Sequence, residues 1–166
     1  CSKISRGYES IRNKISIDKI SEEINMIKAI MHGCNGKMGY AVASAVAQRE
    51  DCKIAFGIDL YGENTTAFPV YKSFSEVSDK VDVIIDFSNA KAVDDLLVYS
   101  VEKQIPVVLC TTGLSEEQLA KVNETATKVA VLKSANMSLG INMLMELLKK
   151  AATILAPAGF DMEIVE

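Results

Sequence analysis

The chain has 166 residues, 49% of them hydrophobic and 24% charged, which is ordinary for a globular domain with one buried core. Its net charge of −4, without any basic stripe, argues against a nucleic-acid partner, because affinity for a phosphate backbone requires clustered Lys and Arg. The 4 cysteines form no CxxC pair and no apolar run reaches membrane-spanning length, so we expect a soluble, cytoplasmic protein without a metal site, a disulfide framework or a membrane partner.

Residues 1–25 precede the first methionine, Met26, and are rich in Ser, Ile and mixed charges. Isoleucines recur in this stretch at near-helical spacing, which is compatible with a short amphipathic helix. The alternative is an extension that does not fold. We therefore expect residues 1–25 to be an N-terminal appendage, either helical or disordered.

From Met26 onward, short apolar runs rich in β-branched residues alternate with longer amphipathic stretches, which is typical of βαβ units around a parallel sheet. We predict strands over residues 27–32, 53–59, 81–87, 107–110 and 129–133, and helices over 37–49, 90–103, 116–127 and 139–155. Ser115 and Gln118 have the spacing of a capping box, which supports the start of the third helix. Right-handed crossovers place helices on both faces, so residues 26–156 should form a doubly wound parallel α/β sheet, a Rossmann-like dinucleotide-binding domain.

The last residues, 157–166, differ from the helix before them. Pro157 and Gly159 end that helix, and apolar residues then alternate with acidic ones, which predicts the first strand of a further segment. The chain contains no partner strand for it.

A glycine loop lies between the first predicted strand and the first predicted helix. Gly33, Gly36 and Gly39 have GxxGxxG spacing, and we assign them a tight turn, a close approach to a pyrophosphate and close helix packing, respectively. The helix-start amides would face the anion. Such glycines can also form a plain tight turn, but the setting between a strand and a helix favours nucleotide binding.

Asp59 ends the second predicted strand, about twenty residues after Gly39, where a carboxylate can accept hydrogen bonds from the adenosine ribose. This position favours NADH, because a carboxylate repels a 2′-phosphate. Lys37 in the glycine loop could bind that phosphate, so NADPH stays open as a cofactor. The alternatives are a solvated strand end for Asp59 and a solvated helix-start cation for Lys37.

Polar clusters follow the later strands as well: Ser88 and Asn89, then Thr111 and Thr112, then the turn 134–138. Ligands of open α/β sheets lie at the carboxyl ends of the strands, so Thr111 and Thr112 are expected near the nicotinamide ribose or carboxamide, and the turn 134–138 beside the nicotinamide. Each cluster alone is compatible with ordinary turn chemistry, whereas their recurrence favours a ligand site.

No catalytic group is predicted within the chain. The single histidine, His32, precedes the glycine loop without a nucleophile motif nearby, and we interpret it as structural. Cys34 and Cys110 are expected to border the cofactor cleft, the alternative being that they pack as small apolar side chains.

Four segments, HGCNGKMG, VIIDFS, CTTGL and SANMSLGIN, occur in this order and together resemble dihydrodipicolinate reductase from Met26 to Glu166. The resemblance implies hydride transfer from NADH or NADPH to a cyclic imino dicarboxylate, with loss of water, in the diaminopimelate route to lysine. By matching position, it assigns the pyrophosphate to Gly33, Cys34, Asn35, Gly36, Lys37 and Met38, and the adenosine ribose to Asp59. It places Cys110, Thr111, Thr112, Ser134, Ala135, Asn136 and Met137 near the nicotinamide side. Cys110 stands where the family usually has glycine, and Met137 where it often has an aromatic residue.

The resemblance also implies parts that these 166 residues do not contain. In the family, the strand that ends in EIVE runs into a His-His motif and a Lys that serve the acid and the substrate, followed by a substrate domain whose sheet forms a homotetramer. We therefore expect this chain to be the cofactor half, binding the nucleotide without turnover. The alternatives are a non-catalytic nucleotide-sensing Rossmann module and a different two-domain dehydrogenase that shares the fold.

Overall fold

The computed structural model describes residues 26–61, 67–77 and 80–163, in two compact units that divide after Lys133. The expected appendage, residues 1–25, lies outside the described residues. Each unit is described by itself below. Within the described part of the chain, no helix is both long enough and apolar enough to cross a membrane.

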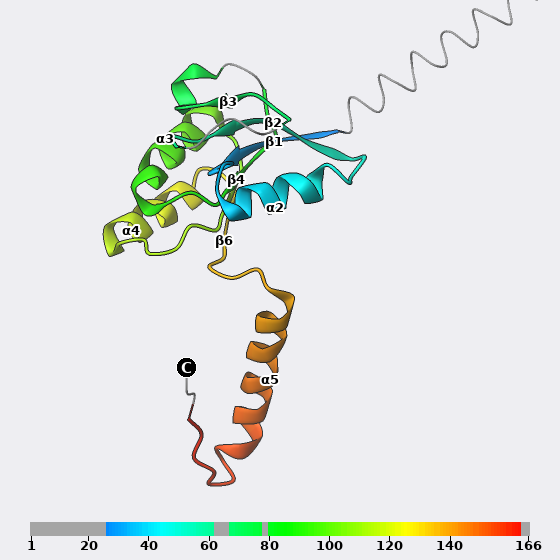
Figure 1. Ribbon diagram of the computed structural model, residues 1–166. Coiled ribbons are helices and arrows are strands. Elements are labelled where there is room, and N and C mark those ends of the chain that lie inside the picture. Colours follow the sequence, from blue (N-terminus) through cyan, green and yellow to red (C-terminus); the bar gives the residue numbers. More distant parts are fainter. Residues whose placement is uncertain (1–25, 62–66, 78–79, 164–166) are drawn as a thin grey trace, which may run out of the picture. The chain divides into compact units, whose positions relative to one another are not determined.

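The described residues of the first unit form a six-stranded sheet in the order β3-β2-β1-β4-β5-β6, with parallel pairing throughout (Figure 1). Its strands are β1 (Ile27–His32), β2 (Cys52–Ile58), β3 (Val70–Tyr71), β4 (Val83–Asp86), β5 (Val107–Leu109) and β6 (Val131–Lys133). The predicted strands are confirmed with small shifts at their ends. The sequence analysis missed β3, because two residues are too short to show an alternating pattern.

Helices cover both faces of this sheet: α2 (Lys37–Val46) lies on one face, and α3 (Val93–Lys103) and α4 (Glu116–Ala126) lie on the other (Figure 1). The doubly wound fold is thus confirmed. The helix predicted over 90–103 begins instead as a 3-10 turn, η2 (Ala90–Ala92), because Asn89 Oδ1 accepts a hydrogen bond from Lys91 N at 3.1 Å. A second 3-10 turn, η1 (Phe74–Glu76), was not predicted.

The core of the first unit lies between the sheet and the layer formed by α3, α4 and η1. Ile30, Ile84 and Leu96 are fully buried there, and each large apolar side chain buried in this way contributes about 1.5–3 kcal/mol. Phe74 and Tyr99 stack with ring centres 4.7 Å apart and so join η1 to α3.

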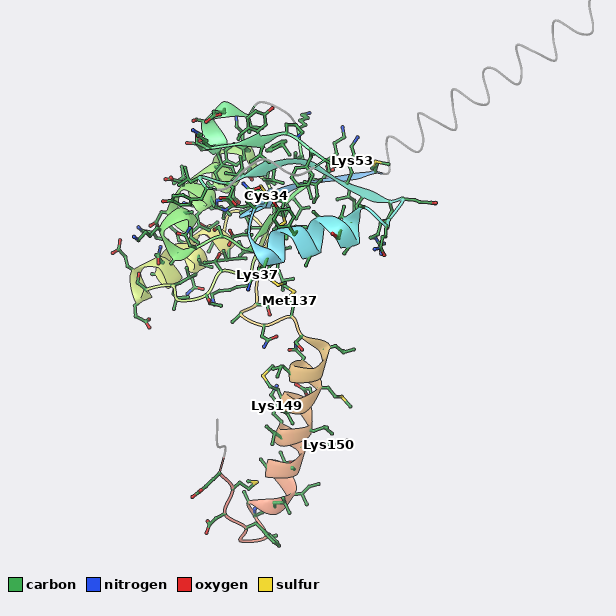
Figure 2. All side chains as sticks on the ribbon, in the orientation of Figure 1. Cys34, Lys37, Lys53, Met137, Lys149 and Lys150 are labelled. Carbon is green, nitrogen blue, oxygen red and sulfur yellow. The ribbon has the colours of Figure 1, made fainter. Side chains whose placement is uncertain are left out.

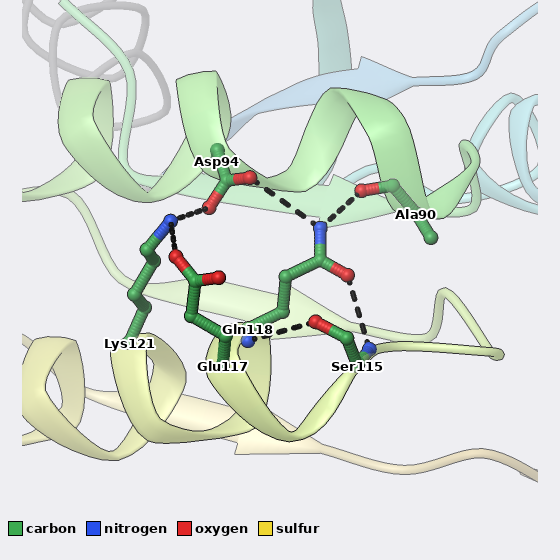
Figure 3. A network of polar contacts seen from close by, with 6 residues as sticks. All are labelled: Ala90, Asp94, Ser115, Glu117, Gln118 and Lys121. Atoms are coloured by element: carbon green, nitrogen blue, oxygen red, sulfur yellow. Dashed lines mark hydrogen bonds and ion pairs between the residues drawn. The ribbon is translucent and has the colours of Figure 1, made fainter.

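A polar network joins α4 to η2 and α3 (Figure 3). The predicted capping box is confirmed: Gln118 N donates to Ser115 Oγ at 3.2 Å, and Ser115 N donates to Gln118 Oε1 at 3.1 Å. Gln118 Nε2 also donates to Ala90 O at 2.6 Å, and Lys121 Nζ lies 3.0 Å from Asp94 Oδ1. The start of α4 is therefore closed by its own side chains.

The second unit begins at Ser134 and contains α5 (Leu139–Leu155), with the predicted bounds. Gly159, at φ +83°, forms the turn after the helix, where Phe160 N donates to Leu155 O at 3.1 Å. The strand expected over 157–166 is absent from the described part, residues 157–163, and 164–166 lie outside the described residues. The strand stays a prediction, because alternation forms a strand only beside a hydrogen-bonded neighbour, and the described residues of this unit offer none.

Candidate cofactor site

The glycine loop leaves the carboxyl end of β1 and enters α2. Gly33 has a φ of +79°, and a Cβ on it would lie 2.6 Å from Phe87 O, so only glycine fits this turn. Gly33 N donates to Ile58 O at 2.8 Å, and Gly36 N donates back to Gly33 O at 3.2 Å. The loop is thus folded tightly over the ends of β1 and β2.

The other two glycines differ in the space around them. A Cβ on Gly39 would collide with the backbone of Gly33 and Cys34, including Cys34 O at 2.6 Å, so α2 packs closely against the loop, where we predicted close packing against the strand. A Cβ on Gly36 would approach only Gly33 O, at 3.3 Å. That contact is tight but single, and Gly36 is exposed and lines the cleft where a pyrophosphate is predicted.

The start of α2 lacks a side-chain cap, because its N-cap residue is Gly36. Lys37 and Met38, in the first turn, are exposed, and Figure 2 shows Lys37 at the start of α2. The first amides of a helix have no partner within the helix, so an uncapped start leaves these donors available to an anion.

Asp59, the residue after β2, is bound to the glycine loop. Asn35 N donates to Asp59 Oδ2 at 2.9 Å, and Tyr61 N donates to Asp59 Oδ1 at 3.0 Å. Asn35 Nδ2 donates to Tyr61 O at 2.8 Å, which closes the group. Each carboxylate oxygen has more than one acceptor position, so Asp59 can still accept hydrogen bonds from two ribose hydroxyls.

The loop and Asp59 line one side of a cleft of about 860 Å³, a volume within the range of small-molecule sites. Lys72 and Phe74, which follow β3, line it as well, and Ser88 and Asn89, which follow β4, form the opposite side. The sequence analysis predicted Asp59 and the glycine loop in one site, and they share this cleft. It did not single out Lys72 or Phe74.

A buried histidine and carboxylate meet at the cleft, which His32 lines. His32 Nδ1 is 2.8 Å from Asp86 Oδ1, and the two residues are 4% and 0% exposed. Burial by itself would raise the pKa of Asp86, but the hydrogen bond and charge of His32, with the hydroxyls of Ser88 and Thr111, lower it below its usual value. Asp86 is therefore held as a buried carboxylate.

This carboxylate sets the hydrogen-bond direction of Ser88. Ser88 Oγ donates to Asp86 Oδ1 at 2.6 Å, and Ser88 N donates to the same oxygen at 3.2 Å. Because the hydroxyl proton points at Asp86, Ser88 Oγ presents lone pairs to the cleft it lines. A ligand group that contacts Ser88 Oγ should be a hydrogen-bond donor, such as a sugar hydroxyl or an amide.

Sequence reasoning assigned His32 a structural role and did not consider Asp86. The two residues end neighbouring strands and are register partners between β1 and β4, although they are far apart in sequence. The available signal was one histidine in the last position of a predicted strand and one acid in the position before the last of another.

The two cysteines expected at the cleft border are both buried. Cys34 is 0% exposed, and the Cα of Gly57 lies so close that a Cβ there would collide with Cys34 Sγ. Burial, followed by the charge of Asp59, raises the pKa of Cys34 to about 11. The Cys34 side chain therefore packs inside the domain, as in the alternative interpretation, and only its backbone remains a candidate cofactor contact.

The CTTG segment after β5 divides into a buried and an exposed part. Cys110 and Thr111 are buried, and burial followed by the charge of Asp86 raises the pKa of Cys110. Thr111 Oγ1 lies 3.4 Å from Ser88 Oγ, so Thr111 joins the polar group beneath the cleft. Thr112 and Gly113 are exposed.

The predicted nicotinamide-side turn belongs to the second unit. Asn136 organises it: Asn136 Oδ1 accepts from Ser138 N at 2.8 Å, and Asn136 O accepts from Ser134 Oγ at 3.1 Å. Ala135 and Met137 are exposed in this unit. The contact of these residues with a nicotinamide stays a prediction.

Comparison with known proteins gives a consistent family. A family model described as "Dihydrodipicolinate reductase, N-terminus" matches residues 27–137. A protein of Caldanaerobacter subterraneus subsp. tengcongensis is 47% identical over 143 residues, covering 85% of this chain and 55% of the relative. A protein of Clostridium novyi is 42% identical over 141 residues, with 85% and 56% covered. Both are named 4-hydroxy-tetrahydrodipicolinate reductase, and this chain spans about half the length of these curated relatives.

Solved structures share the fold. A dipicolinate-bound dihydrodipicolinate reductase from Paenisporosarcina sp. TG-14 matches with a TM-score of 0.67 at 23% identity, over 76% of this chain and 54% of that one. An NAD-binding protein from Listeria innocua matches with a TM-score of 0.58 at 16% identity, over 76% and 40%. At these identities the likeness supports the Rossmann-like fold alone.

Proposed function

This chain belongs to the dihydrodipicolinate reductase family, and on that premise we propose that it is the nicotinamide-dinucleotide-binding part of an NADH- or NADPH-dependent 4-hydroxy-tetrahydrodipicolinate reductase. The proposed reaction reduces a cyclic imino dicarboxylate, with loss of water, in the diaminopimelate route to lysine. The observation that carries the proposal is the binding of Asp59 to the glycine loop at the edge of one cleft, through Asn35 N at 2.9 Å.

Each of the predicted contact residues has a proposed task. The backbone from Gly33 to Met38, with the uncapped start of α2, binds the pyrophosphate, and Lys37 adds a positive charge. Asp59 accepts from the hydroxyls of the adenosine ribose. Thr111, Thr112, Cys110 and the turn of Ser134, Ala135, Asn136 and Met137 serve the nicotinamide end. The bound dinucleotide supplies the hydride.

The remainder of the proposed enzyme corresponds to the half of the relatives that this chain does not match. We assign to that half the His-His motif and Lys that bind the substrate carboxylates and donate the proton, and a homotetramer interface. The cytoplasm is the proposed compartment, which fits the free thiols of Cys34, Cys52 and Cys110.

Titration of the 166-residue chain with NADH and NADPH, followed by nucleotide fluorescence or calorimetry, tests the proposal. We expect saturable binding below millimolar concentration and no turnover of the imino dicarboxylate by this chain alone. Asp59→Ala should weaken binding about tenfold, the equivalent of one lost charged hydrogen bond. Asp51→Ala is the matched control, because Asp51 pairs with Arg49 on the surface and does not line the cleft. Absence of saturable binding would contradict the proposal.

A further inference from the structure

We propose that Lys72, together with the hydroxyls of Ser73 and Ser75, binds the 2′-phosphate when the dinucleotide is NADPH. The inference rests on the proposed function and deepens it, because it assigns the choice of cofactor to residues after β3. Asp59 alone would favour NADH.

The register of the sheet places Lys72 beside Asp59. Strand β2 pairs with β3 through Ile58 and Tyr71, and Asp59 N donates to Tyr71 O at 3.0 Å. The next residues of the two parallel strands, Asp59 and Lys72, therefore leave the same edge of the sheet as neighbours, about 5 Å apart in backbone spacing. Both residues line the cleft. A phosphate on the ribose that Asp59 binds would thus lie within reach of Lys72.

The positive charge of Lys72 is not used within the described part of the protein. Lys72 is exposed and forms no ion pair with any described residue, whereas Lys121, Lys128 and Lys149 each pair with a carboxylate. The adjacent Asp59 carboxylate accepts two backbone amides instead of an ammonium group. Lys72 therefore offers an unpaired cation at the ribose end of the cleft.

The two serines add a hydroxyl donor. Ser73 Oγ and Ser75 Oγ are 2.5 Å apart, and Ser75 N donates to Ser73 Oγ at 3.1 Å. Only one of the two hydroxyl protons is used in the hydrogen bond between these serines, whichever serine donates. The other hydroxyl proton can be donated to a ligand. Ser73 and Ser75 line the cleft with Lys72. A cation and a hydroxyl donor together match a phosphate ester better than they match a neutral hydroxyl.

Two other lysines are alternatives that the experiment separates. Lys37 lies in the glycine loop, where the pyrophosphate is proposed to bind. Lys91 lines the cleft from η2, after β4, on the opposite side of β1 from Asp59. A lysine that contacts only the shared pyrophosphate affects NADH and NADPH alike. A loss of NADPH binding alone in Lys37→Gln, and not in Lys72→Gln, would assign the 2′-phosphate to Lys37 and overturn the inference.

The test measures dissociation constants of NADPH and NADH for the parent chain and for Lys72→Gln, Ser73→Ala, Lys37→Gln and Lys91→Gln. Lys72→Gln should weaken NADPH on the order of tenfold and change NADH by less than about twofold. Ser73→Ala should have a smaller effect in the same direction. Lys37→Gln and Lys91→Gln should change both cofactors by a similar factor. Adenosine 2′,5′-bisphosphate should displace NADH from the parent chain more effectively than from Lys72→Gln.

Three results would overturn the inference: an equal loss of both cofactors in Lys72→Gln, an unchanged affinity for NADPH in that variant, or a parent chain that binds NADH but not NADPH. Binding of neither cofactor to the parent chain would overturn the proposed function, and the inference with it. The circular dichroism spectrum of each variant is the control for folding. A variant that keeps the parent's spectrum but binds more weakly has lost binding and not its fold.

Discussion

The helices α2 and α4 begin in opposite ways within one domain. The start of α4 is closed by Ser115 and Gln118, which satisfy each other's backbone donors. The start of α2 has Gly36 in the same position and no side-chain cap. A serine in place of Gly36 would stabilise α2 by roughly a few tenths of a kcal/mol and would occupy an amide that an anion needs. The domain thus closes the helix start that packs against η2 and α3 and leaves open the one whose N-cap residue, Gly36, lines the cleft.

The largest expected effect on the free energy of unfolding comes from the glycines at the uncapped start of α2. Gly39→Ala should lower the free energy of unfolding by about 3 kcal/mol or more, because its Cβ would meet the backbone at Cys34 O. Gly36→Ala should lower it less than Gly39→Ala does, because its Cβ would meet only Gly33 O, at 3.3 Å, and a shift of a few tenths of an ångström relieves that contact; it should still weaken NADH binding. Urea denaturation and NADH titration measure the two effects. Equal stability losses would remove the distinction between the two glycines.

The next effect concerns the charge beneath the cleft. Asp86→Asn should lower the free energy of unfolding by about 3 kcal/mol at neutral pH, because it leaves His32 in a buried pair without its carboxylate. Since folding lowers the pKa of Asp86, its charge stabilises the protein above the unfolded pKa, and this contribution disappears as the pH falls through the lower folded value. Between about pH 5 and pH 3, the parent should therefore lose more stability than Asp86→Asn. Denaturation at several pH values measures this, and parallel curves would contradict it.

At the start of α4, a substitution of the capping residue should lower the stability of the domain and leave NADH binding unchanged. Ser115→Ala removes one half of the capping box and should lower the free energy of unfolding by about 1 kcal/mol. The dissociation constant for NADH should not change. Ser115→Asn, which retains a capping oxygen, should restore most of the stability. A change in NADH affinity in Ser115→Ala would show that the two helix starts are coupled.

The smallest effect on stability is expected for the exposed ion pairs of the polar network that joins α4 to α3. Lys121 pairs with Asp94 at 3.0 Å and with Glu117 at 3.1 Å, but these groups are exposed to solvent and screened by salt. Lys121→Gln should leave both the unfolding midpoint and NADH binding within experimental error. A clear loss of stability would show that the α3 to α4 contact depends on charge more than on the bonds of Gln118.

Local signals were sufficient for much of this molecule. The capping box, the glycine loop and the long periodic helix α5 are each encoded within a few residues, and each is found where the sequence predicts it. Features that depend on register between strands were missed. His32 meets Asp86, and Lys72 neighbours Asp59, only because β1 pairs with β4 and β2 pairs with β3.

The position of Cys34 shows the same limit for a single side chain. Its place within the glycine loop predicts a residue at the cleft border, but the thiol turns inward because Gly57, on β2, leaves room for it. That room exists only when β2 lies beside β1, and no pattern within the loop reports it.

The buried thiol of Cys34 has a consequence for the chemical behaviour of the loop. A thiolate is the species that reacts with oxidants and alkylating reagents, and a pKa of about 11 with complete burial leaves almost none of it at neutral pH. Modification of Cys34 therefore requires the loop to lift away from Gly57. Its rate reports how often the loop opens, and any molecule that holds the loop closed protects this sulfur without touching it.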